Sequence, residues 1–441
     1  MISPILLVIL SILLLIALIM WAKLDTFLSF LVVSILLALS CGLDGPQIGK
    51  SISTGIGSTL GSLVTILGFG AMLGKLVADS GAAQRITTSM IRIFGTRHIQ
   101  WGMALAGLLV GIPMFYTAGF VIVVPLIFAT GMATRLPLLY IGIPMISALS
   151  TAHGFLPPHP SPTAISQQLG ADLGKTLLYG LIISIPTIAI AGPLFGSRLK
   201  NMLVTPEQGL LNISFRPDAE LPGLGLSLFT ALLPLVLLTI TTIVDPFVTA
   251  GSTVQRITAV IGDPNVAMLL SVLGAVWLLG LRRGLGMKAV MKSMESAFKE
   301  VAPIMLIIAG SGVFMQVIKD GNINTYIGEA LRHLPVSPLV LGWIIAAVIR
   351  VCVGSATVAG LTTVGILLPL IQNQAVQPEL MVLSIGAGSL MFSHVNDGGF
   401  WLFKEYFNLS LKQTFATWSV METIVSVCGL GGVLVLQQFI G

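Results

Sequence analysis

Residues 150–163 read Ser-Thr-Ala-His-Gly-Phe-Leu-Pro-Pro-His-Pro-Ser-Pro-Thr, inside a stretch, 136–171, without a single Asp, Glu, Lys or Arg. A stretch of this length and composition is long enough to cross a membrane. Proline lacks an N–H group and clashes with the preceding helical turn, so a helix cannot continue through Pro157-Pro158. The segment 137–172 is therefore predicted to be a membrane helix that is interrupted near its middle.

The composition of the whole chain places this segment in a polytopic membrane protein. Of 441 residues, 55% are apolar and 9% are charged, and the mean hydropathy is +1.00. A soluble protein carries roughly 25% charged residues, so soluble enzymes, nucleic-acid binders and disordered scaffolds are excluded. The net charge of +5 says little about substrate, because cytoplasmic loops of membrane proteins retain Lys and Arg. Three cysteines in no metal-ligand spacing predict neither a metal site nor a disulfide, and no cofactor motif is present.

Two of the apolar runs have an unusual length. Runs 99–131 and 337–371 each exceed 30 residues, and both are broken near the middle by small and polar residues, at 111–119 and 354–360. A re-entrant helical hairpin fits this pattern, provided that its irregular tip is buried in protein or faces a water-filled cavity. The alternative is a long, tilted helix with a glycine kink. The other runs are predicted as full crossings: 4–21, 25–42, 58–78, 137–153, 174–198, 223–244, 264–281, 301–318, 378–394 and 414–440.

The distribution of Lys and Arg predicts the orientation of these crossings. Segments 79–98 and 282–300 are rich in basic residues, whereas 43–57 and 245–263 contain one each. The basic segments are therefore expected in the cytoplasm, with both termini outside.

The two halves of the chain resemble each other at a constant offset. Asp79 and Asp320, Gly119 and Gly360, and His153 and His394 are each 241 residues apart. The predicted crossings give the halves opposite orientations, which is typical of secondary transporters with a substrate site near the bilayer midplane. The predicted domains are N-terminal scaffold spans (1–57), repeat 1 (58–198), a linker with two spans and a basic cytoplasmic loop (199–300), and repeat 2 (301–441).

Repeat 2 has its own interrupted segment, 378–410, where Ser393-His394-Val395-Asn396-Asp397-Gly398-Gly399 matches the proline-rich break of repeat 1. The predicted fold is thus an all-α polytopic membrane protein, an inverted-repeat secondary transporter with two re-entrant helical hairpins and two interrupted helices. A channel can also contain re-entrant segments, but a ring of identical filter segments is not visible in this sequence.

The interruptions predict where a substrate binds. A helix that starts after Pro162 presents free N–H groups and a positive dipole end, which suit a carboxylate. The hairpin tips add hydroxyl groups, although these can instead bond within their own helix or pack between helices. The candidate substrate-binding residues are Thr117, His153, Thr163, Ser355, Thr357, His394 and Asn396.

Ionisable side chains inside a membrane are costly and indicate function. Asp397 is the first candidate for proton coupling, with capping of the next helix as the alternative, and His153 is the second, with a structural role as the alternative. Lys75 and Arg350 lie inside apolar runs, which we interpret as snorkelling rather than substrate contact. Lys404-Glu405 is interpreted as an exposed pair beside a cytoplasmic loop.

Four segments resemble the gluconate permease family of bacterial proton symporters, which also includes carriers of related sugar acids and of D-serine. They are "LGFGAMLGKLVADSGAAQRI" (67–86), "HGFLPPHPSPTAI" (153–165), "GSATVAG" (354–360) and "FSHVNDGGFWLFKEYFNL" (392–409). The resemblance covers almost the whole chain, and the gluconate-carrying branch of the family is the most similar to this sequence. It implies a bacterial inner-membrane location, proton symport, homodimers and an elevator-like motion. One departure is Thr117, where the family pattern leads us to expect an acidic residue.

The sequence therefore predicts a proton-coupled symporter that imports gluconate or a related small hydroxy-carboxylate, with the lipid bilayer, protons and a second copy as its partners. Nucleic acid is not expected as a partner. The alternatives are a carrier of a different sugar acid or of a hydroxy amino acid such as D-serine, or an anion channel. An integral-membrane enzyme would need a catalytic motif, and HExxH, GxSxG and CxxC are all absent.

Overall fold

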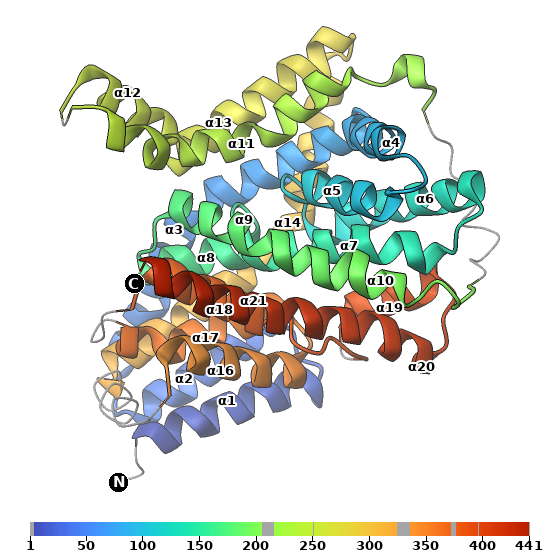
Figure 1. Cartoon of the computed structure of the whole chain (residues 1–441). Helices are drawn as coiled ribbons and strands as arrows, with labels where there is room; N and C mark the ends of the chain where they lie inside the picture. The colour runs from blue at the N-terminus through green and yellow to red at the C-terminus, as the bar shows by residue number, and fades with distance from the viewer. Residues whose placement is uncertain are drawn as a thin grey trace.

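The computed structural model describes residues 4–204, 216–249, 251–323, 336–371, 376–395 and 397–440. Every regular element in these ranges is a helix, which confirms the predicted all-α class (Figure 1). The helices are α1 (Pro4–Met20), α2 (Thr26–Ser40), α3 (Gly45–Asp79), α4 (Ala82–Phe94), α5 (Ile99–Gly111), α6 (Tyr116–Thr134), α7 (Leu138–Phe155), α8 (Pro160–Leu169), α9 (Leu173–Ala189), α10 (Phe195–Ser197), α11 (Leu224–Val244), α12 (Thr253–Gly262), α13 (Pro264–Ala275), α14 (Met287–Asp320), α16 (Pro338–Val353), α17 (Ala356–Ile371), α18 (Pro378–Gly388), α19 (Gly398–Tyr406), α20 (Leu411–Thr414) and α21 (Val420–Ile440).

Several of these helices are long and apolar enough to span a bilayer. Seven such helices occur within the described ranges, and an eighth is obtained if the two parts of α3, which meet at 44°, are counted as one span. Apolar helices of 10 to 17 residues accompany them; these include α5, α16 and α17 of the predicted hairpins, whereas α6 is one of the seven long helices. The start of α1 and the end of α21 both lie on the left in Figure 1.

The helices α3 and α14 are much longer than the predicted spans 58–78 and 301–318. A capping box fixes the start of α3, because the Asp44 side chain accepts a hydrogen bond from the Gln47 N–H (2.9 Å) and the Gln47 side chain accepts one from the Asp44 N–H (2.8 Å). The added turns of α3 were missed because their buried stripe is built largely from small residues, which a search for apolar runs overlooks. That stripe is Ile48, Ser51, Gly55, Thr59 and Leu63.

The same two helices pack against each other in opposite directions. Ser51, near the start of α3, bonds to Asp320 at the end of α14, whereas Asp79, at the end of α3, bonds to Ser293 near the start of α14. Between these points, Gly55 lies against Gly312 and Val313. Helices that are equivalent by the offset of 241 thus cross antiparallel, as the predicted inversion of the two halves requires.

Both over-long runs are divided into two helices at the predicted breaks. The first break separates α5 from α6 at 112–115, and the second separates α16 from α17 at 354–355. In the second pair, Gly342 near the start of α16 lies against Leu367 near the end of α17, so the two helices fold back on each other. Non-helical residues interrupt both runs, so a single continuous kinked helix is wrong for each of them.

The two predicted interruptions are also present. Residues 156–159 separate α7 from α8, and residues 389–397 separate α18 from α19. One detail of the prediction is wrong, because α8 starts at Pro160 and not after Pro162. Proline is well tolerated in the first helical turn, where its missing N–H has no partner in any case.

The segment 79–98, predicted as a basic loop, contains the amphipathic helix α4. Its Arg85 donates to the carbonyl groups of Asp218 and Pro222, and Arg92 pairs with the Asp218 carboxylate at 3.2 Å. From the other basic segment, 282–300, Arg283 donates to the Glu220 carbonyl. The segments 79–98, 216–222 and 282–300 therefore meet at one end of the molecule, as the charge pattern predicts for loops on a single membrane side.

Candidate functional site

A cavity of about 800 Å³ lies where the interrupted segments meet. Its wall includes the start of α6, the end of α7, the tip between α16 and α17, the break before α19, and α21. The predicted convergence of hairpin tips and broken helices is thus present in the structure. Five predicted site residues line this cavity: Thr117, His153, Ser355, Thr357 and Asp397.

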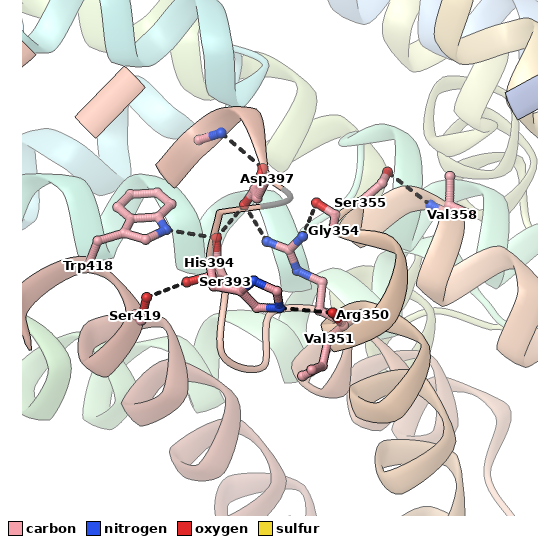
Figure 2. Close-up of polar contacts among 11 residues, drawn as sticks. Arg350, Val351, Gly354, Ser355, Val358, Ser393, His394, Asp397, Trp418 and Ser419 are labelled. Atoms are coloured by element: carbon pink, nitrogen blue, oxygen red, sulfur yellow. Dashed lines mark hydrogen bonds and ion pairs between the residues drawn. The ribbon is translucent and has the colours of Figure 1, made fainter. Parts of the chain in front are cut away.

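The strongest polar contact at the cavity is an ion pair between Arg350 and Asp397 (Figure 2). Arg350 lies in the last turn of α16 and is 3% exposed; one terminal nitrogen donates to Asp397 and the other to the Gly354 carbonyl. Asp397 also accepts from the Ser393 hydroxyl and, at 2.9 Å, from the Gly399 N–H. These hydrogen bonds offset part of the desolvation cost of burying the two charges.

A second layer of contacts holds this ion pair in place. The Trp418 indole donates a 2.7 Å hydrogen bond to the Ser393 hydroxyl, and the Ser419 hydroxyl donates to the Ser393 carbonyl (Figure 2). The break before α19 is thereby tied to the helical turn that leads into α21. Asp397 also serves as the N-cap of α19, which was the structural alternative considered for it.

The helices α6 and α17 begin at the cavity, and the first backbone N–H groups of each have no partner within their own helix. The N-cap of α6 is Phe115, whose side chain makes no capping bond, so the N–H groups of Tyr116 and Thr117 are unsatisfied by their own helix. At the start of α17, the Ser355 hydroxyl accepts from the Val358 N–H at 3.3 Å, which leaves the first two N–H groups of that helix free. Both helix ends favour negative charge through their dipoles.

The buried Arg350 adds a side-chain donor to these backbone groups. Its Nε is buried and has no hydrogen-bond partner among the described residues. A guanidinium has five N–H donors, and the contacts to Asp397 and Gly354 leave Nε unused. The site therefore offers an anion one charge-assisted hydrogen bond in addition to the helix ends.

Aromatic and imidazole side chains form another part of the wall. The His153 ring lies 5.8 Å from the Tyr116 ring and 5.4 Å from the His159 ring, measured between centroids. Tyr116 Oη and His153 Nδ1 are both buried, and neither has a hydrogen-bond partner within the part of the chain that the structure describes. These two atoms can bond to hydroxyl groups of a polar solute.

His153 and His394 have equivalent positions in the sequence of the two repeats, but they do not make equivalent contacts. His394 Nε2 lies 2.9 Å from the Val351 carbonyl, in the last turn of α16. In repeat 1 the corresponding contact, 2.8 Å to the carbonyl of Gly111 in α5, is made by His159 and not by His153. His153 is therefore free to face the cavity, while His394 supports a hairpin.

The remaining predicted residues lie elsewhere. Thr163 is buried in α8 and does not line the cavity, and Pro160 and Pro162 remove two of the first three N–H groups of that helix. The expected anion-binding terminus after Pro162 is thus replaced by the starts of α6 and α17. His394 also does not line the cavity, and Asn396 lies outside the described residues.

Sequence reasoning missed two charged residues of the site. Arg350 was interpreted as snorkelling, which is wrong, because its head group is buried at the cavity. Glu422 lines the same cavity and is 1% exposed. The signal for Glu422 was available, since it is the only charged residue in 413–441. Glu405, interpreted as part of an exposed pair of little consequence, also reaches the cavity while bonded to Lys404.

An all-helical membrane protein whose broken helices enclose a charged cavity has the features of a membrane transporter. Comparisons with known proteins agree with this class. The sequence profile of the GntP family permeases matches residues 3–440, and the chain belongs to this family. The predicted resemblance to the gluconate permeases is thereby confirmed, and the chain is a transporter and not an enzyme.

Individual relatives match over their whole length. The high-affinity gluconate transporter of Escherichia coli (strain K12) is 45% identical over 437 residues, which cover 99% of this chain and 100% of that protein. The Gnt-II system L-idonate transporter of the same organism is 44% identical over 434 residues, covering 98% and 99%. Among solved structures, the Alcanivorax borkumensis YdaH transporter matches with a TM-score of 0.67 at 15% identity, covering 94% of this chain and 98% of that one.

Proposed function

We propose that this protein is a symporter that carries gluconate or a related sugar acid, together with protons, across the bacterial inner membrane. The observation that carries the proposal is the donor set of the cavity. Arg350 and the first residues of α6 and α17 line the same cavity, and a guanidinium and two helix N-termini all suit a carboxylate. The names of the relatives, gluconate and L-idonate transporters, support a sugar acid as the cargo.

The rest of such a substrate also finds partners in the cavity. A sugar acid carries several hydroxyl groups, each of which needs a hydrogen bond when it leaves water. The hydroxyls of Thr117, Ser355 and Thr357 line the wall with His153 and Tyr116. The arrangement suits a solute with one charged end and a polar chain, and we propose that both hairpins are re-entrant, with their tips at this depth.

Transport assays in proteoliposomes test this function. Purified protein should accumulate labelled gluconate when a pH gradient, acidic outside, is imposed, and it should not do so without the gradient. Excess unlabelled L-idonate, D-serine and other acids then rank the substrates by competition. Accumulation that ignores the pH gradient would exclude proton symport, and a current far above carrier turnover would indicate an anion channel.

A further inference from the structure

We propose that Glu422, in α21, is the residue that binds the coupling proton. This inference rests on the proposed proton symport and assigns its proton site. Sequence reasoning placed that role on Asp397 first and on His153 second. The contacts of Asp397 and Glu422 lead to a different assignment.

Asp397 is fully engaged as a charged carboxylate. It pairs with Arg350, accepts from the Ser393 hydroxyl, and accepts from the Gly399 N–H at the start of α19. Each of these donors favours the ionised form of the carboxyl group. Protonation would also leave the guanidinium of Arg350 buried without a counter-charge, which is strongly unfavourable. The pair is thus suited to stay charged throughout a transport cycle.

Glu422 has the opposite surroundings. The Ser150 side chain lies beside its carboxyl group in the cavity wall, while Oε1 is buried and has no hydrogen-bond partner among the described residues. Within the same residues it makes no ion pair, because the nearby Arg350 is occupied by Asp397. A buried carboxylate without a counter-charge is costly, so a proton on Glu422 removes a large desolvation penalty.

The groups that face Glu422 belong to several elements, and their charges can be counted. Arg350 and Asp397 cancel each other, and Ser150 and His153 from α7 and Tyr116 from α6 complete the surroundings. At the rim, Glu405 is bonded to Lys404 at 2.7 Å. With the histidine neutral, the charge of the empty cavity is then that of Glu422 alone.

This count gives a reason for coupling. A substrate carboxylate that enters the cavity repels an ionised Glu422, and the repulsion is strong because the site is shielded from water. Binding of the anion therefore favours a proton on Glu422, and by linkage the proton favours binding of the anion. The net charge is −1 both when the carrier is empty with Glu422 ionised and when it is loaded with Glu422 protonated.

Glu422→Gln tests the assignment, because it mimics the protonated side chain at nearly constant volume. In proteoliposomes, exchange of labelled for unlabelled gluconate across the membrane should continue, since exchange needs no net proton movement. Accumulation driven by a pH gradient should disappear, whereas the parent accumulates about tenfold per pH unit if one proton crosses with each anion. Glu379→Gln is the matched control, because Glu379 is a buried acid at the start of α18, outside the cavity, and this variant should accumulate as the parent does.

The outcomes separate this inference from the proposed function. If the parent protein does not use the pH gradient at all, proton symport is wrong. If the parent uses it and Glu422→Gln still does, or if the inserted variant also loses exchange, the assignment to Glu422 is wrong. Asp397→Asn should lose exchange as well as accumulation. If this variant kept exchange and lost only accumulation, Asp397 and not Glu422 would be the proton-binding residue.

A second variant, Glu422→Asp, tests the assignment if the Glu422→Gln protein does not insert into the membrane. Glu422→Asp keeps the carboxyl group but withdraws it from Ser150 by one methylene, so the pH midpoint of gluconate uptake should move. An unchanged midpoint in an active Glu422→Asp protein would overturn the assignment.

Discussion

Ser51 of α3 donates a 2.6 Å hydrogen bond to Asp320 of α14. The equivalent bond in the other half, from Ser293 to Asp79, has the same length. The acids are 241 residues apart and the serines 242, so the two bonds are related by exchange of the repeats. One twofold axis perpendicular to the helix pair accounts for both bonds, and the inverted repeat is thus visible in side-chain contacts as well as in helix order.

The crossing of these helices yields a first prediction. A Cβ added at Gly55 would lie 2.6 Å from the Val313 backbone, so Gly55→Ala forces α3 and α14 apart. Overpacking of this kind costs about 1–3 kcal/mol. We expect a lower melting temperature of the detergent-purified protein, measured by intrinsic fluorescence.

Gly57→Ala, on the same helix, is the matched control, because a Cβ added at Gly57 meets no atom within 4 Å. It should be neutral or should stabilise by up to about 1 kcal/mol through helix propensity. Equal melting temperatures for the two variants would contradict the close crossing.

The predicted membrane orientation can be tested by labelling single cysteines with an impermeant reagent in intact cells and in inverted vesicles. Replacing the exposed Ile93 of α4 or Met287 of α14 should give labelling only from the cytoplasm, because both lie at the end where the basic segments meet. Phe247, beyond the other end of α11, should label only from outside. Labelling of Ile93 and Met287 positions from opposite faces would refute the inversion.

Much of this fold could be predicted from a few residues with strong backbone effects. Proline cannot continue a regular helix, so the interruption at Pro157-Pro158 was readable directly from the sequence. Gly398-Gly399 indicated the second interruption through the backbone freedom of glycine, although both residues lie in the first turn of α19, just after the break. The offset of 241 then indicated that the breaks of the two halves meet. The division into scaffold, repeats and linker remains a prediction.

The missed features depend on partners that a linear sequence does not name. Arg350 has the sequence context of a snorkelling side chain, and only the fold brings Asp397, 47 residues later, to its head group. The helix α4 was hidden in a segment chosen for its charge, because a half-buried helix has no apolar run. For Glu422 the rule on isolated intramembrane charges was sufficient, but it was applied only to the interrupted segments.

The ion pair at the cavity gives a third prediction. Arg350→Met leaves the Asp397 charge without its counter-charge, and Asp397→Leu does the reverse and also removes the cap of α19. Each single change should destabilise the protein by about 3–5 kcal/mol. The double variant should be closer to the parent than either single variant, because an apolar pair of similar volume often replaces a buried ion pair without loss.

Thermal unfolding of the four proteins forms a double-mutant cycle that isolates the interaction of the pair. The double variant should nevertheless fail to bind gluconate, because the guanidinium is gone. A coupling energy near zero would mean that the contact is not formed, and binding that survives in the double variant would remove Arg350 from the proposed site.

The last prediction concerns the hydroxyl groups of the second hairpin tip. Thr357 lies in the first turn of α17 and lines the cavity, whereas Thr363, two turns further on, is buried and donates to the Ala359 carbonyl of its own helix at 2.7 Å. Threonine and valine have nearly the same shape, so Thr357→Val and Thr363→Val remove one hydroxyl each with little change in packing. Ser355 is a poorer choice, because its hydroxyl also caps the helix through Val358.

If Thr357 bonds to a hydroxyl group of the substrate, Thr357→Val should weaken gluconate binding about two- to tenfold, since a hydrogen bond between uncharged groups is worth roughly 0.5–1.5 kcal/mol. Thr363→Val should bind as the parent does, and both variants should reach the membrane in normal amounts. Calorimetric titration of the purified proteins measures the difference. Equal affinities would show that the tip of α17 only packs against its neighbours, and the carboxylate would then be held by Arg350 and the start of α6.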